Sequence, residues 1–436
     1  MNVWSVAALG IGAMVGAGIF ALLGQAALIA GSETYLAFLI GGGVAALSGY
    51  SYAKLAARYP ESGGISEYFD EAFGAGRLAG TLTLIYLVTL AVTIAMVART
   101  FGAYAAPLLL NTSDPAWVGV FGSAILLLLI LLNLAGRQMV GRTQLILVAV
   151  KLVILTGLML AGLVGTHAHP LSEQTQPSTY GIIASVGLTF FAYAGFGMMA
   201  NAAGSVVHPA RTIPRAIYLA IAVVAVLYVG LAVVVLQSIS PQKITANADT
   251  AVAEAARPVL GHSGYVIVSI AALLATASSI NATVFSALRI ATALADTGRL
   301  PGAFKPRFWR NGSNGVVISV GGILLAMNFL HLSAIASIAS ATFLIAYLAV
   351  HVAHWRLSQE TGGSRAVIMF GALSMAAVLL VFLWHVATTQ PWSIGMIAAF
   401  VAGSALLETA QKRRGSLGPP GPRPLRAAPS RRPSSP

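Results

Sequence analysis

One lysine lies in the middle of an otherwise apolar run, and its position is the clearest sign of chemistry in the sequence. Residues 145–155 read Leu-Ile-Leu-Val-Ala-Val-Lys-Leu-Val-Ile-Leu, with Lys151 as the one ionisable side chain. An ammonium group at the centre of a bilayer costs about 3 kcal/mol on insertion scales, so such a residue is functional by default. Lys151 can release and regain a proton, or it can serve structure alone by snorkelling or by bonding a backbone carbonyl. Because snorkelling from mid-span is difficult, the pattern favours proton transfer.

Two glycine clusters indicate a second kind of chemistry, the binding of a small charged molecule by backbone groups. Glycine occupies positions 10, 12, 16 and 18, and again positions 195 and 197. Irregular backbone at membrane depth is tolerated only where it lines a cavity or is buried in protein. Free N–H groups attract a carboxylate, and freed carbonyls accept an ammonium group. The glycines can instead serve close helix contact alone, but their matching positions in the first and sixth spans favour a binding site.

The elements that carry these residues are helices that cross a membrane. Apolar residues make up 57% of the 436 residues and charged residues only 8%, whereas about a quarter of the residues in a soluble domain are charged. Each crossing of the hydrocarbon layer needs roughly 20 apolar residues. The pattern predicts an all-α polytopic membrane protein of twelve spans, at 3–30, 34–58, 77–110, 116–136, 141–165, 179–207, 214–238, 264–296, 315–331, 333–355, 366–387 and 391–410.

The basic residues predict the orientation of these spans. With the N-terminus in the cytoplasm, 21 of the 25 Lys and Arg residues fall on the cytoplasmic side, Lys243 and Arg257 fall outside, and Arg99 and Lys151 lie within spans. This asymmetry follows the positive-inside rule and predicts a multi-pass protein of the cell (inner or plasma) membrane with both termini in the cytoplasm. In a soluble protein the net charge of +13 would suggest nucleic acid. Because the charge lies in loops and a tail, we expect membrane lipid and no nucleic acid as its partner.

The chain divides into three predicted parts. Residues 1–358 form a core of ten spans, residues 359–410 form spans eleven and twelve, and residues 411–436 form a basic, Pro-rich cytoplasmic tail that we expect to be disordered. Residues 239–263 are expected to form the one sizeable outer loop. The acidic segment with Glu67, Asp70 and Glu71, between the second and third spans, is expected to be a solvated loop with salt bridges.

Motifs in five spans resemble those of the amino acid–polyamine–organocation (APC) superfamily, most closely its ApcT-type proton-coupled amino-acid permeases. The matching stretches are 12–20, 51–64, 140–152, 195–217 and 281–301, in order and at the spacing of the family. The resemblance covers the chain to about residue 410. It implies a LeuT-type fold, in which spans 1–5 and 6–10 are inverted repeats and two further spans are added.

The same resemblance implies residue roles. The predicted substrate-binding residues are Gly16, Ala17, Gly18 and Ile19 on the carboxylate side and Phe191, Ala192 and Gly195 on the amine side. Phe191 is also the predicted gate over the substrate, with a packing aromatic as the alternative. Lys151 takes the place that a sodium ion occupies in other members, which implies proton coupling, and Ser278 and Ser279 are its possible partners. The chain departs from the family at 201–205, where many members carry an acid and this sequence has none.

These observations predict a secondary amino-acid transporter that works by alternating access with proton symport, and not an enzyme. An amino-acid or amine exchanger is the alternative in the same class. An ion channel would need a continuous polar pore, and a membrane-embedded hydrolase would need paired catalytic groups within spans; the sequence shows neither. There is no P-loop, so we expect no use of ATP. His351 and His354 have metal-ligand spacing, but no Asp, Glu or Cys lies near them in sequence, so we predict no metal and no cofactor.

Overall fold

The chain folds into helices throughout the residues that the structure describes. The structure is a computed structural model and describes residues 1–60, 64–135, 142–165, 179–200, 203–206, 208–305 and 313–413. The predicted tail from residue 414 onward and Asn201 and Ala202 lie outside these ranges. The long helices are α1 (Val3–Ala30), α2 (Thr34–Arg58), α4 (Arg77–Leu110), α5 (Pro115–Leu134), α6 (Arg142–Gly165), α7 (Thr179–Tyr193), α9 (Pro209–Ser238), α11 (Ala251–Asp296), α12 (Asn314–Phe329), α13 (Leu332–Arg356), α15 (Arg365–Thr389) and α16 (Pro391–Arg413).

Short helical elements join the long ones. After α7 come η3 (Ala194–Phe196), α8 (Gly197–Ala200) and η4 (Ala203–Ser205). The other connections contain η1 (Gly31–Glu33), α3 (Ile65–Phe73), α10 (Pro241–Ala246), η5 (Ala248–Thr250), η6 (Gly302–Phe304) and α14 (Ser358–Thr361). The described residues contain no strand.

Each predicted span coincides with a long helix except the sixth, 179–207, which is divided between α7 and shorter helical elements, and two loops also differ. Among the described residues, ten helical segments are long and apolar enough to cross a membrane, and Val3–Gly16 and Asn314–Phe329 are shorter apolar helices. The expected outer loop is largely helical, because α11 begins at Ala251 and continues through a kink at Gly261, whose φ of +69° suits glycine. The acidic segment forms α3, an amphipathic helix that buries Ile65, Tyr68 and Phe69.

Local sequence signals fix several helix ends. The side chain of Asn2 caps α1, and Asp114 caps α5 ahead of Pro115 at the first helical position. Such oxygen acceptors satisfy backbone N–H groups that have no partner within the helix. At the other end of α4, Asn111 adopts the left-handed conformation that often terminates a helix.

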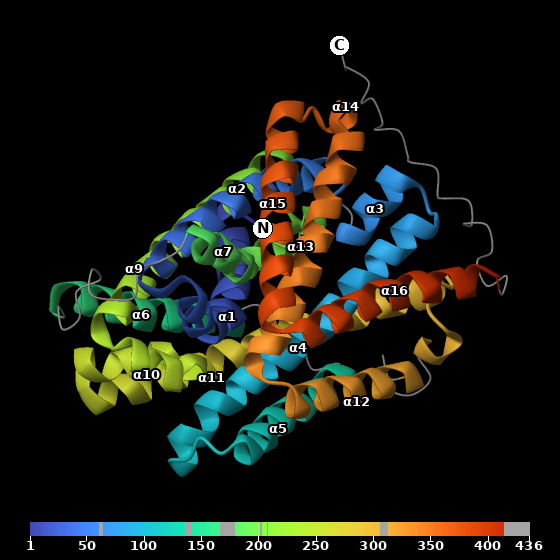
Figure 1. The fold of residues 1–436 in the computed structure, drawn as a ribbon. Coiled ribbons are helices and arrows are strands. Elements are labelled where there is room, and N and C mark those ends of the chain that lie inside the picture. The colour runs from blue at the N-terminus through green and yellow to red at the C-terminus, as the bar shows by residue number, and fades with distance from the viewer. Residues whose placement is uncertain are drawn as a thin grey trace.

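The packing places α1 in the interior of the bundle. It contacts α7, α9, α11 and α6, and these elements surround it in Figure 1. The contacts are reciprocal: α2 pairs with α9 and α4 with α11, while α1 packs on α9 as α7 packs on α2. Likewise α4 packs on α13 as α11 packs on α6. Two equivalent sets of five helices related by a pseudo-twofold axis make pairings of this kind.

The two ends of the bundle differ in charge. At one end, which we call the basic end, α2 and α13 finish near Lys54, Arg58 and Arg356, and Arg299, just after α11, pairs with Asp70 of α3. At the opposite end, α1 meets η5 through a hydrogen bond from Gln25 to Asp249. Arg99, which lies within a predicted span, donates to the Met327 carbonyl of α12 at 2.7 Å.

Large apolar side chains cover the outer helices. On α15 alone, Phe370, Leu373, Leu380 and Trp384 are each more than 60% exposed. Continuous apolar surface of this kind is unusual on a soluble monomer and suits contact with lipid. The protein is therefore a multi-pass, all-α membrane protein.

Candidate functional site

A small enclosed cavity lies where α1, α4, α7, α11 and α13 meet. Most of the predicted site residues that the structure describes lie in its wall or directly behind it. The residues that line it are Ala13, Met14, Gly18, Tyr86, Leu90, Thr93, Phe191, Ala192, Ala194, Gly195, Met198, Ser279, Thr283 and Phe343. None of these side chains is charged, so any charged group of a ligand here is met by backbone dipoles and hydroxyls.

The predicted substrate-binding residues fall into two groups in the structure. Gly18, Phe191, Ala192 and Gly195 line the cavity. Gly16 lies behind the wall against Ser279, and Ile19 is fully buried without lining the cavity. The side chain of Ala17 lies outside what the structure describes, although its backbone belongs to α1.

Three glycines allow α1 to touch its neighbours at backbone distance. A Cβ added at Gly18 would lie 2.6 Å from Ala192 Cα, and one added at Gly195 would lie 2.5 Å from the Met14 amide nitrogen. A Cβ at Gly16 would lie 2.7 Å from Ser279 Cβ. Real Cβ contacts are longer than this, so any side chain at these positions would push the helices apart.

Helix α1 bends at one residue, and side chains from other helices bond the carbonyls beside the bend. Val15 alone leaves helical geometry, with a ψ of 17°. Lys151 Nζ donates to the Gly12 carbonyl at 2.7 Å, and the Tyr228 hydroxyl donates to the Met14 carbonyl at 2.6 Å. The irregular backbone expected at this glycine cluster is thus a bend at one residue, and both of these carbonyls find donors.

The ammonium of Lys151 is enclosed by protein. The residue is 1% exposed and ranks among the largest fully buried side chains. The two ion pairs in the described part of the chain, Arg257–Glu254 and Arg299–Asp70, do not involve it. The hydrogen bond that the structure gives to this buried amine runs to the Gly12 carbonyl.

The serines predicted to accompany Lys151 lie on α11, which packs against both α6 and α1. Ser279 lines the cavity and contacts Gly16, and Ser278 is buried on the same turn. The acceptor that the structure gives to Lys151 is the Gly12 carbonyl. The role of the two serines stays a prediction.

The sixth span does break. Helix α7 ends at Tyr193, a 3₁₀ turn covers Ala194–Phe196, and α8 follows from Gly197. The Tyr347 hydroxyl donates to the Ala194 carbonyl at 2.5 Å. The sequence therefore located this break correctly, one turn beyond Phe191.

Aromatic rings close one side of the cavity. The ring of Phe191 packs edge-on against Phe343 at 5.0 Å between centroids, and Phe343 also contacts Tyr86. Such edge-to-face pairs stabilise a wall while leaving each ring free to change rotamer. Phe191 is thus placed where a gate would lie, and the contact with Phe343 equally fits a packing role.

Sequence reasoning missed the hydroxyl groups that hold this site together. Tyr228 and Tyr347 bond the bent backbone of α1 and the broken sixth span, while Thr93 and Thr283 line the cavity. Each is a polar residue within an apolar span, and that isolation was the available signal. Their targets lie 214 and 153 residues away for the two tyrosines, so spacing alone could not supply the pairing.

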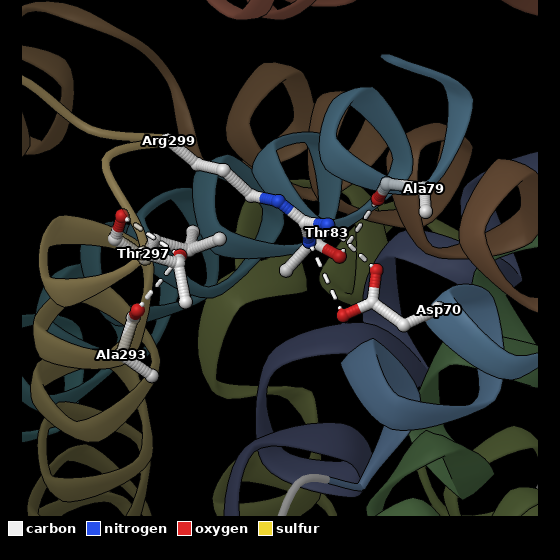
Figure 2. Close-up of polar contacts among 7 residues, drawn as sticks. Asp70, Ala79, Thr83, Ala293, Thr297 and Arg299 are labelled. Carbon is white, nitrogen blue, oxygen red and sulfur yellow. Dashed lines mark hydrogen bonds and ion pairs between the residues drawn. The ribbon is translucent and has the colours of Figure 1, made fainter. Parts of the chain in front are cut away.

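Polar contacts join elements at both ends of the bundle. At the basic end the Arg299 guanidinium, just beyond α11, forks onto the Asp70 carboxylate of α3 at 2.8 and 3.3 Å (Figure 2). At the other end η5 packs on α1, with Gln25 Nε2 2.7 Å from Asp249 Oδ1. Burial raises the pKa of the Asp249 carboxyl, an effect that the nearby Arg99 and the Gln25 hydrogen bond partly oppose.

Comparisons with known proteins agree with this architecture. A family described as amino acid permease matches residues 1–406. The inner membrane transport protein YbaT of Escherichia coli is 45% identical over 409 residues, which is 93% of this chain and 94% of that protein. The Asc-type amino acid transporter 1 of the mouse is 31% identical over 67% of this chain and 57% of that protein. The methylthioribose transporter of Bacillus subtilis is 26% identical over 81% of this chain and 80% of that protein.

The family match covers the whole helical bundle, and these relatives are all transporters rather than enzymes. The chain therefore belongs to the amino acid permease family of the APC superfamily and is a secondary amino-acid transporter.

Proposed function

We propose that this protein is a proton-coupled amino-acid symporter that works by alternating access. Substrate binds in the cavity between the bend of α1 and the broken sixth span. The reciprocal helix contacts support a LeuT-type arrangement of two inverted repeats, with α15 and α16 as additional helices. In such an arrangement the site lies at the interface between repeats, and rocking about it exposes the site to each side in turn.

The observation that carries the proposal is the bond between Lys151 Nζ and the Gly12 carbonyl. It joins the one fully buried lysine to the helix that forms half of the cavity wall. A protonated amine holds that carbonyl, whereas a neutral amine donates to it more weakly. Proton binding at Lys151 therefore favours one position of α1, and this couples the proton to the substrate-binding state.

The cavity favours amino acids with uncharged side chains. Its lining has no charged residue that could neutralise a charged side chain. The Thr93 and Thr283 hydroxyls donate to the carbonyls of Thr89 and Ser279, so they face the cavity as acceptors. Acceptors on one wall suit the substrate ammonium. The name of the methylthioribose relative indicates that an uncharged solute without the amino-acid backbone should be included in any substrate panel.

The proposed location is the cell (inner or plasma) membrane, with the basic end and both termini in the cytoplasm. The positive-inside rule supports this orientation, because the basic loops at one end of the bundle belong on the cytoplasmic side. In this orientation the Arg299–Asp70 contact closes the cytoplasmic side of the cavity.

Transport by purified protein in liposomes tests the proposal. With an inward proton gradient, radiolabelled neutral amino acids should accumulate above their outside concentration, and substrate addition should acidify the vesicle interior. Replacing potassium by sodium at constant pH and ionic strength should leave the rate unchanged. Stimulation by sodium would contradict proton coupling, and uptake that requires a counter-substrate inside would identify an exchanger instead.

A further inference from the structure

Two buried imidazoles on α13 belong to an unbroken chain of hydrogen-bonded side chains that the transport cycle above does not use. His351 Nε2 lies 3.1 Å from Ser48 Oγ, and its Nδ1 lies 3.1 Å from Ser51 Oγ. Ser51 Oγ also lies 3.0 Å from His354 Nδ1, and His354 Nε2 lies 3.1 Å from Thr361 Oγ1. We call these five side chains from α2, α13 and α14 the imidazole chain.

The imidazole chain is fully satisfied with both rings neutral. If Thr361 donates to the Leu357 carbonyl, as its 3.0 Å contact allows, it accepts from His354, which in turn accepts from Ser51. In the same direction, Ser51 then accepts from His351, and His351 accepts from Ser48. The opposite polarity is equally satisfied along the two rings, because each hydroxyl and each neutral imidazole has one donor and an acceptor to offer. A chain with two equivalent polarities can pass a proton along its length.

The fold makes room for these rings and excludes water from them. Ser48, Ser51, His351 and His354 are each at most 1% exposed. A Cβ at Gly371 of α15 would lie 2.6 Å from His351 Cε1, and one at Gly363 would lie 2.6 Å from His354 Nε2. Within the described residues no group of three or more His, Cys, Asp or Glu gathers to hold a metal, and hydroxyls take up all four ring nitrogens. The geometry therefore suits protons rather than a cation.

The two ends of the imidazole chain lie in different surroundings. Thr361 is half-buried beside the exposed Glu360 at the basic end, and Glu360 accepts a hydrogen bond from Tyr59 at 2.8 Å. Burial and that bond raise the pKa of Tyr59 to about 12, so Tyr59 keeps its proton and Glu360 is the acceptor of this pair. Lys54 lies close enough to act on His354 electrostatically, and Arg365 bonds Ser358.

The inner end of the imidazole chain is Ser48, and a neighbouring residue of α13, Tyr347, contacts the wall of the substrate cavity. One turn before His351 on α13, Tyr347 donates to the Ala194 carbonyl, and Ala194 lines the cavity. The Tyr347 ring lies 5.0 Å from that of Tyr52, which follows Ser51 on α2. One face of α13 thus carries Phe343, Tyr347, His351 and His354 in turn from the cavity to the basic end.

We propose that the imidazole chain is a proton relay that links the region of the broken sixth span to the basic end while the cavity is closed. A proton that arrives on Ser48 or His351 displaces the proton on the far nitrogen of each ring in turn, and one proton leaves from Thr361 to water or to Glu360. No bond other than O–H and N–H is broken or made, and each transfer leaves the chain with its original number of protons. The inference rests on the proposed proton symport and assigns to it a release route that is separate from Lys151.

Ser51→Ala and Thr361→Val test the relay, because each removes one hydroxyl and interrupts the imidazole chain. Matched controls are Ser340→Ala, which is buried on α13, and Thr388→Val, whose hydroxyl bonds only to its own helix. Proteoliposomes report net uptake driven by a proton gradient, internal acidification, and counterflow of labelled against unlabelled substrate. We expect net uptake and acidification to fall by about tenfold, as when one proton-transfer group is lost, while counterflow, which needs no proton release, stays close to the wild-type rate.

The possible results separate the relay from the symport on which it rests. If both interrupted variants keep wild-type net uptake, or if net uptake and counterflow fall by the same factor, the chain only holds α2 against α13 and the relay is wrong. If the wild-type protein moves substrate without acidifying the vesicle, the symport proposal itself fails. Thr361 lies at the surface, so Thr361→Val decides the question even where Ser51→Ala does not fold.

Discussion

The first and sixth spans hold their irregular backbone in different ways. In α1 a single residue, Val15, leaves the helix, and the carbonyls before it are bonded by Lys151 and Tyr228. The sixth span stops at Tyr193 and restarts at Gly197, and its Ala194 carbonyl accepts from the Gly197 N–H and from the Tyr347 hydroxyl. One bend is therefore held in part by an amine, which we propose changes its charge, and the other in part by a phenol.

This difference suggests a division of labour between two equivalent helices. In the proposed cycle the state of α1 depends on a proton, because an amine donates to its Gly12 carbonyl. Both helices line the cavity, α1 through Ala13, Met14 and Gly18 and the sixth span through Phe191, Ala192, Ala194 and Gly195. On this proposal only α1 carries the coupling, so variants on the two sides should fail differently.

The largest expected effect comes from removing the contact between the two helices. Gly18→Ala should abolish transport, because its Cβ would meet Ala192 Cα at 2.6 Å and overpacking of this kind costs about 1–3 kcal/mol. Gly43→Ala on α2 is the matched control, since nothing lies within 4 Å of an added Cβ there. Uptake and thermal stability in detergent check both variants, and a fully active Gly18→Ala protein would show that the two helices are not in fixed contact.

Removing the hydroxyl of Tyr228 or of Tyr347 tests whether the two helices do different work. Tyr228→Phe and Tyr347→Phe each remove one hydrogen bond to a backbone carbonyl, at a cost of about 0.5–1.5 kcal/mol. The Ala194 carbonyl keeps the Gly197 N–H as a donor. We expect Tyr228→Phe to lower the number of protons moved per substrate molecule. We expect Tyr347→Phe to raise the KM and to leave the number of protons per substrate unchanged. Parallel measurement of substrate and proton fluxes distinguishes them. Identical behaviour of the two variants would mean that the helices do not divide the work.

A smaller effect is expected at the predicted gate. Phe191→Ala removes the ring that packs on Phe343, so bound substrate should escape more readily and KM should rise by about tenfold, with faster efflux from loaded vesicles. Phe191→Leu keeps an apolar side chain, so its KM and its efflux rate should lie between those of the wild-type protein and of Phe191→Ala. A loss of thermal stability with unchanged KM and efflux would assign Phe191 to packing alone.

Much of the fold could be predicted from the sequence because a bilayer restricts the possible structures. Apolar runs long enough to cross it and an uneven distribution of Lys and Arg specify helices and their directions with few alternatives. The glycines at 16, 18 and 195, which the sequence favours as parts of a binding site over helix contact alone, also lie at close helix contacts. Lys151 stood out because few charges are tolerated at its depth.

The site itself depends on pairings between distant residues that no local pattern encodes. Nothing near Tyr228 shows that its hydroxyl reaches Met14, and nothing near His351 shows that Ser48 and Ser51 complete its hydrogen bonds. His351 and His354 have metal-ligand spacing, but three of the four hydroxyl contacts of their rings come from Ser48 and Ser51, about 300 residues away in sequence. The irregular backbone expected in the first span is a bend at one residue, Val15.

The proposed coupling between proton and substrate movement depends on Lys151, and Lys151→Ala removes its amine. Gradient-driven accumulation and counterflow are measured on the same proteoliposomes, with Lys412→Ala near the end of α16 as the control for loss of a lysine. We expect that Lys151→Ala no longer concentrates substrate under an inward proton gradient but still exchanges it, because the cavity remains and the titrating amine is gone. If the variant still concentrates substrate in response to the proton gradient, Lys151 does not couple proton and substrate movement.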